Sequence, residues 1–191
     1  MLLVSLAIGR VMGISVWDQM PASINAFLVG LVATIPMLIF LVFVYQSRAK
    51  EFVEIRVLIR DLLGETLAAC RWYDLIILAL LAGFSEEFLF RGTLEPLLSR
   101  FGWLIGLVAC NILFGICHAV TPTYAVMAGL MGGYLSLSVR FGSEPNLMIP
   151  VICHSLYDLI AFIVVRSSHL AYVAKSHARS DDFTDSPEDS D

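Results

Sequence analysis

The sequence predicts an all-α protein, a polytopic bundle of transmembrane helices. Hydrophobic residues make up 58% of its 191 residues, charged residues only 15%, and the mean hydropathy is +0.81. Ordinary soluble domains contain about 45–50% apolar and about 25% charged residues. Several apolar runs also approach the roughly 20 residues that a helix needs to cross a bilayer. Together these observations favour one compact helical bundle in a membrane.

The N-terminal segment, residues 1–21, begins with an apolar stretch over residues 1–17 that Arg10 and Gly13 interrupt. This stretch lacks the basic region that precedes the apolar core of a secretory signal. We therefore expect a short or tilted N-terminal membrane helix.

Residues 22–72 are expected to form a transmembrane helix and then an amphipathic helix in the membrane interface. The first, over 22–45, is predominantly apolar and contains Pro36, a kink that neighbouring membrane helices can accommodate. The second, over 46–71, interleaves charged and apolar residues. Its five Lys and Arg residues place this connection on the cytoplasmic side by the positive-inside rule.

Residues 73–165 contain four further apolar spans, over 73–98, 102–120, 124–139 and 147–165. Strict alternation from the cytoplasmic connection puts the C-terminus in the cytoplasm, so we expect a multi-pass protein of a bacterial inner or plasma membrane. Small residues in the third of these spans form a face that lets a neighbouring helix approach closely. They are Ala125, Ala128, Gly129, Gly132, Gly133 and Ser136.

The C-terminal segment, residues 166–191, carries most of the formal net charge of −5, chiefly within residues 181–191. An acidic stretch with a single aromatic residue cannot bury enough apolar surface to order itself. We therefore expect a cytoplasmic, acidic, disordered tail. Nothing in this charge pattern indicates a nucleic-acid partner.

The four cysteines lie in or beside apolar segments and show no paired spacing. We interpret them as small core hydrophobes rather than as metal ligands. They are Cys70, Cys110, Cys117 and Cys153.

Two adjacent carboxylates and an arginine lie in the middle of the 73–98 span: Glu86, Glu87 and Arg91. Ionisable residues there are costly unless they face a protein interior or a water-filled cavity, so they indicate a functional site. At ~100° per residue, Glu87 and Arg91 share a helix face, which predicts an ion pair and leaves Glu86 free for chemistry. The simpler alternative is a structural salt bridge with Glu86 at a water-exposed helix end.

Two histidines and an aspartate lie in later spans. His118 is a single histidine near the end of the 102–120 span, where a core or interfacial residue is the simpler interpretation. His154 and Asp158 share a helix face, where an intrahelical hydrogen bond would satisfy both. Six such groups on three helices of one small bundle are hard to explain without a function, so we predict that they form one site.

The order of these motifs resembles a known family. Glu-Glu-x-x-x-Arg, Phe-x-x-x-His and His-x-x-x-Asp follow one another on successive apolar helices within residues 73–165. This order is similar to that of the type II CAAX prenyl endopeptidase and bacteriocin-processing (CPBP or Abi) family of intramembrane proteases. The resemblance implies that Glu86 and His118 together activate a water for attack on a peptide carbonyl.

The resemblance also implies roles for the remaining groups. Glu87 and Arg91 would hold the first helix and tune the site. His154 and Asp158 would polarise the carbonyl or stabilise the oxyanion. Many members have asparagine at the position of Asp158, and an aspartate can donate a hydrogen bond to an oxyanion only when it is protonated.

A metal is the main mechanistic alternative. Glu86, His118 and His154 are three residues that can bind Zn²⁺ and leave a fourth position for water. The family has been described both as metalloproteases and as metal-free, glutamate-dependent proteases. We expect the metal-free mechanism with no cofactor, a membrane as the environment, and a peptide or protein as the substrate.

Two non-enzymatic alternatives remain open. Buried Glu, His and Arg also mark ion paths. Against a transporter stand the small number of spans and the absence from the sequence of paired broken helices in two matching halves. A scaffold or immunity partner would use the polar cluster for binding only. The protease hypothesis needs a water-filled pocket open to the cytoplasmic side, and a large separation of His118 from Glu86 would contradict it.

Overall fold

A computed structural model describes residues 1–184, with side chains to residue 178. The described residues contain helices and no strand, which confirms the all-α prediction. The elements are α1 (Leu2–Met12), the 3₁₀ turn η1 (Trp17–Gln19), α2 (Ile24–Gln46), α3 (Lys50–Ala69), α4 (Trp72–Leu89), the π-helical turn η2 (Phe90–Leu94), α5 (Glu95–Leu98), the 3₁₀ turn η3 (Ser99–Phe101), α6 (Trp103–Cys117), α7 (Pro122–Ser138) and α8 (Met148–Thr184).

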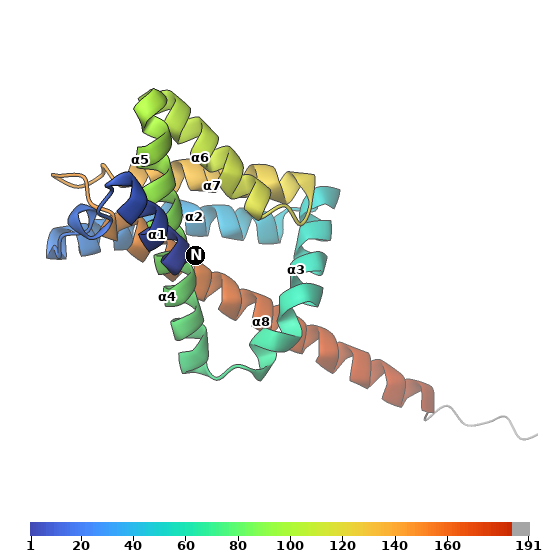
Figure 1. Cartoon of the computed structure of the whole chain (residues 1–191). Helices are drawn as coiled ribbons and strands as arrows, with labels where there is room; N and C mark the ends of the chain where they lie inside the picture. Colours follow the sequence, from blue (N-terminus) through green and yellow to red (C-terminus); the bar gives the residue numbers. More distant parts are fainter. Residues whose placement is uncertain (185–191) are drawn as a thin grey trace, which may run out of the picture.

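Helix α8 is the element against which most of the bundle packs. It lies along α2, α3 and α4 and also contacts α7, while α6 packs on α7 and α5. Figure 1 shows α6 and α7 side by side and α8 running past α3 at the far end of the bundle. Because α4, α6 and α8 carry the three sequence motifs, this packing decides where the predicted site forms.

Two helices are long and apolar enough to cross a membrane, Ile24–Gln46 and Met148–Ala178. Length and composition alone give this result, and Leu2–Met12 and Trp103–Cys117 are shorter apolar helices. The alternation of the helices across the membrane, and the side on which the C-terminus lies, remain predictions.

Helix α1 is a short apolar helix, as the sequence predicts, and its place in the membrane stays a prediction. Its 11 residues rise about 16 Å, roughly half the hydrocarbon thickness of a bilayer, so this helix cannot cross by itself. Its end is marked by Gly13 at φ 68°, a left-handed conformation that glycine adopts at little cost. The helix packs against α4 and the π-helical turn.

The predicted disordered tail is wrong for its first part, because α8 continues through residue 165 to Thr184. The physical reason is a second set of contacts with α3. Val165 lies in an apolar cluster with Leu67, and the guanidinium of Arg60 lies 4.0 Å from the ring centre of Tyr172. Residues 185–191, the remainder of the predicted tail, lie outside the described residues.

The cysteine interpretation is correct for two positions. Cys110 and Cys153 are buried, and Cys70 is half-buried beside the cluster of Leu67 and Val165. Cys117 is exposed, since it occupies the last turn of α6, and the prediction of a core position was wrong there.

Two glycines, Gly30 on α2 and Gly129 on α7, allow a neighbouring helix to pack closely. A Cβ atom on Gly30 would lie 2.8 Å from Cβ of Ile152, so α2 and α8 approach closely only because Gly30 has none. On α7, a Cβ on Gly129 would lie 3.1 Å from the carbonyl oxygen of Asn111, whereas Gly133 has nothing within 4 Å. The predicted small-residue face therefore packs against α6 at Gly129 but not at Gly133.

The contrast between Gly30 and Gly133 predicts opposite effects of the same substitution. Gly30→Ala should lower the thermal unfolding midpoint in detergent, because overpacking typically costs 1–3 kcal/mol. Gly133→Ala should leave it unchanged or raise it, because alanine favours a helix by about 1 kcal/mol over glycine. Equal midpoints for the two variants would contradict the described contact between α2 and α8.

Candidate active site

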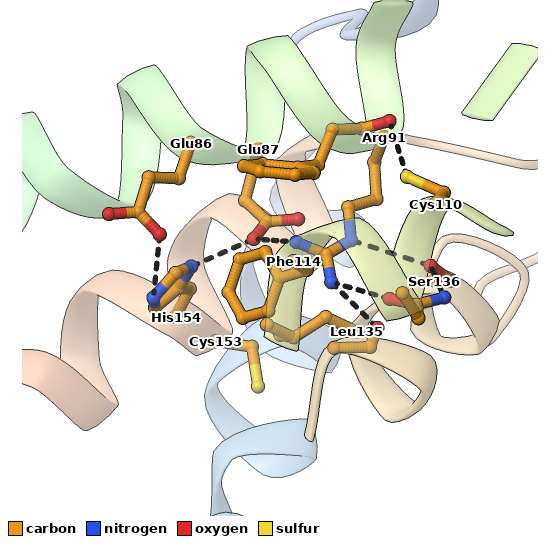
Figure 2. Close-up of polar contacts among 12 residues, drawn as sticks. Glu86, Glu87, Arg91, Cys110, Phe114, Leu135, Ser136, Cys153 and His154 are labelled. Carbon is orange, nitrogen blue, oxygen red and sulfur yellow. Dashed lines mark hydrogen bonds and ion pairs between the residues drawn. The ribbon is translucent and has the colours of Figure 1, made fainter. Parts of the chain in front are cut away.

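The ion pair between Arg91 and Glu87 lies at the centre of the polar cluster (Figure 2). Nη1 of Arg91 lies 2.9 Å from Oε1 of Glu87, and both side chains are 0% exposed. The ion pair that their spacing predicts is thus confirmed. A buried charge pair is tolerated only when further hydrogen bonds satisfy its remaining polar atoms.

Three acceptors on two other helices complete the shell around Arg91. Nη2 donates to Oδ1 of Asn111 on α6 at 3.1 Å and to the carbonyl of Gly132 on α7 at 2.7 Å. Nε donates to Oγ of Ser136 at 3.4 Å, and the Phe114 ring centre lies 4.5 Å from the guanidinium carbon. Arg91 therefore joins α4, α6 and α7 through one side chain.

His154 is held by the same carboxylate. Its Nδ1 lies 2.7 Å from Oε1 of Glu87, which also accepts from Arg91. An ionised carboxylate can only accept, so Nδ1 carries the proton in this contact. The other ring nitrogen, Nε2, then faces Oδ2 of Asp158 at 3.6 Å and Oε2 of Glu86 at 4.0 Å. Figure 2 shows Glu86 and Glu87 reaching His154 from the same side.

His118 faces Glu86 from the end of α6. Its Nδ1 lies 2.8 Å from the carbonyl oxygen of Phe114, and its ring stacks on the Phe114 ring at 4.4 Å between centres. A carbonyl oxygen only accepts, so the proton lies on Nδ1 and the lone pair of a neutral ring lies on Nε2. That Nε2 lies 3.5 Å from Oε2 of Glu86, so the separation that would contradict the hypothesis does not occur.

Three side chains of the cluster are partly exposed at the molecular surface. The side chains of His118, Asp158 and Glu86 are 26%, 18% and 16% exposed, respectively. Glu87 is 0% exposed behind them. The cluster thus has a partly exposed set of side chains, which a substrate can reach, and a buried side chain, Glu87, behind that set. Whether it opens on the cytoplasmic side stays a prediction.

All six residues singled out in the sequence lie in this cluster, and the sequence analysis missed two. Asn111 and Ser136 bond Arg91 and each other, with Nδ2 of Asn111 donating to Oγ of Ser136 at 3.0 Å. Asn111 had a signal, since it is an amide in an apolar span on the same helix face as Phe114 and His118. Ser136 was interpreted as packing, as was Gly132, whose carbonyl also accepts from Arg91.

Glu86, His118 and His154, the three residues that the sequence suggests as zinc ligands, lie close together in the cluster. Within the described residues, no group of three or more His, Cys, Asp or Glu side chains is arranged to hold a metal ion. The two histidine Nε2 atoms lie 3.5 and 4.0 Å from the same carboxylate oxygen, Oε2 of Glu86.

A separate groove of about 750 Å³ lies between α6 and α7. Apolar and small side chains line it, and its only polar lining side chains are Asn111 and Tyr134. It therefore offers no acid, base or nucleophile of its own, and the chemistry remains with the cluster around Glu86.

Comparison with known proteins gives one match. Residues 68–160 match the family model described as type II CAAX prenyl endopeptidase Rce1-like. No curated protein and no solved structure matches the chain. The matched segment holds α4, α6, α7 and the first part of α8, which are the elements that carry the cluster.

Removal of the Arg91 charge should destabilise the fold. Arg91→Gln removes one of the two partners of the buried Glu87 carboxylate and leaves it with His154 alone. Removing one partner of a buried charge pair typically costs about 3–5 kcal/mol. Arg100→Gln is the matched control, because Arg100 is exposed and donates to the carbonyl of Met12. Thermal unfolding in detergent measures both, and similar midpoints would contradict the central place of Arg91.

Proposed function

Through residues 68–160 the chain belongs to the type II CAAX prenyl endopeptidase Rce1-like family, and from that premise we propose that it hydrolyses peptide bonds with a water activated by Glu86 and His118. The family is one of membrane-embedded peptidases, and the finer assignment rests on this chain's own geometry. The observation that carries it is the 3.5 Å approach of Nε2 of His118 to Oε2 of Glu86, a buried oxygen without a hydrogen-bond partner among the described residues, in two side chains that are partly exposed.

The first step is attack of water on the peptide carbonyl. A water that donates to Oε2 of Glu86 or to Nε2 of His118 passes its proton to that base as its oxygen bonds the carbonyl carbon. The tetrahedral intermediate then collapses, and the proton moves to the leaving amine as the C–N bond breaks. The products are a carboxylic acid and an amine, so no co-reactant other than water is needed.

His154 is placed to stabilise the carbonyl oxygen during attack. With a proton on each ring nitrogen, the ring donates from Nδ1 to Glu87 and can donate from Nε2 to the developing oxyanion. The contact with Glu87 at 2.7 Å fixes the ring orientation. The buried ion pair thereby acts on the reaction through His154.

Asp158 takes a different role from the one that the resemblance implies for an asparagine. Its Oδ2 lies 3.6 Å from Nε2 of His154, one turn along α8. An ionised aspartate at that place stabilises a doubly protonated His154 ring by its charge, and does not itself donate to the oxyanion.

The test is cleavage of a mixed peptide library by the detergent-purified full chain, with and without a chelator. Glu86→Gln and His118→Ala should each lower the rate by about 100-fold or more, as expected for loss of general acid–base catalysis. Glu144→Gln, at an exposed glutamate in the loop before α8, is the matched control and should cleave normally.

Each result of this experiment has a distinct meaning. Cleavage that survives the chelator and is lost in both variants supports the glutamate-activated water. Cleavage that the chelator abolishes and Zn²⁺ restores replaces it with the metalloprotease alternative. A folded chain that cleaves no peptide overturns the peptidase assignment and favours transport or scaffold binding.

A further inference from the structure

The turn that carries Arg91 is a π-helical turn, residues Phe90–Leu94, between α4 and α5. The backbone amide of Glu95 donates to the carbonyl of Phe90, five residues earlier, where an α-helix would use the residue four earlier. A π-helical turn interrupts the regular hydrogen-bond pattern, so some backbone carbonyls lose their amide donor and need a side-chain donor instead. Such turns often occur at functional sites. The position of Arg91 therefore depends on what fixes this turn.

Two hydroxyl groups hold the carbonyl of Phe88 at the start of this turn. Oγ of Ser5 lies 2.9 Å and Oγ1 of Thr93 lies 3.0 Å from that oxygen, and the two hydroxyl oxygens lie 2.8 Å apart. Each hydroxyl has one proton to donate, so at most two of these three contacts are hydrogen bonds at any moment. Every such arrangement leaves the Phe88 carbonyl with at least one donor. Ser5 comes from α1, while Thr93 belongs to the turn itself.

The segment between α1 and α2 provides further contacts to the same turn. Nε2 of Gln19 donates to the carbonyl of Gly92 at 2.9 Å. Val16 covers Gly92 so closely that a Cβ atom there would lie 2.5 Å from Cγ1 of Val16. Trp17 packs edge-on against Phe88, with 5.0 Å between ring centres. These contacts join the turn to a segment some 70 residues or more away along the chain.

We propose that residues 1–20 are a positioning element of the active site. Ser5 and Gln19 are positioning residues: they fix the π-helical turn and so hold Arg91 against Glu87, which in turn orients His154. This segment lies outside the matched residues 68–160, so the family match does not supply this role. The catalytic part of the inference rests on the proposed function.

The test uses the full chain and four variants. Ser5→Ala/Thr93→Val removes both hydroxyl donors to Phe88, and Ser5→Ala/Thr93→Ser keeps one of them. Gln19→Leu removes the donor to Gly92. Ser138→Ala is the matched control, because Ser138 is equally buried and its Oγ donates to the carbonyl of Leu135 at 2.7 Å, at the far end of α7.

Two measurements are made on each protein: hydrogen exchange of the backbone amides in residues 90–94, and kcat and KM for a cleaved peptide. Ser5→Ala/Thr93→Val should exchange about tenfold faster there, as expected for loss of one net hydrogen bond. Its kcat should fall by a similar factor with KM unchanged, because the chemistry is misaligned while the substrate contacts remain. Ser5→Ala/Thr93→Ser should stay close to the wild type, and Gln19→Leu should shift both readouts in the same direction.

Faster exchange and lower kcat in Ser5→Ala/Thr93→Val, with neither change in Ser138→Ala, support the inference. Equal behaviour of Ser5→Ala/Thr93→Val and Ser138→Ala, or of the two double variants, overturns it. If the wild type cleaves no peptide, the proposed function fails. The exchange comparison still decides whether the N-terminal segment holds the turn.

Discussion

The structure depends above all on one buried charge pair, the contact between Arg91 and Glu87. Two full charges in an apolar bundle are stable only when both are paired and their remaining polar atoms are bonded. Arg91 meets this condition with Asn111, Gly132 and Ser136. Oε1 of Glu87 accepts from both Arg91 and His154, while its Oε2 has no hydrogen-bond partner among the described residues. The pair thus ties four helices together at the depth where the chemistry is proposed.

This arrangement separates the groups that hold the site from those proposed to react. Glu87 is closed off and can act only through His154, whereas Glu86, the next residue, keeps partial exposure and faces His118. Adjacent glutamates can have different roles because neighbouring residues on a helix point about 100° apart. The same property explains how an adjacent pair of carboxylates can be divided: one bonds the imidazole of His154, and the other is proposed to act on the substrate.

The sequence predicted most of the helices and the six residues of the cluster, and physical reasons explain why other features were missed. The i, i+4 spacing of Glu87 and Arg91 predicted their ion pair, and the helical spans were placed close to their described bounds. The π-helical turn was missed because hydrophobic periodicity does not show a single extra residue in a helix. The docking of α1 and the extension of α8 along α3 were missed because both depend on contacts between segments distant in sequence. Local pattern and composition contain no such information.

The central claim is that Arg91 and Glu87 act as one unit on the reaction, and a double-mutant cycle on peptide cleavage tests it most directly. The rates of the wild type, Glu87→Gln, Arg91→Gln and the double variant are compared on one peptide. The account predicts strong coupling: the double variant should cleave at least as fast as Arg91→Gln alone, because it leaves no buried charge unpaired. Independent effects, with the double variant slower by the product of the two single losses, would contradict it.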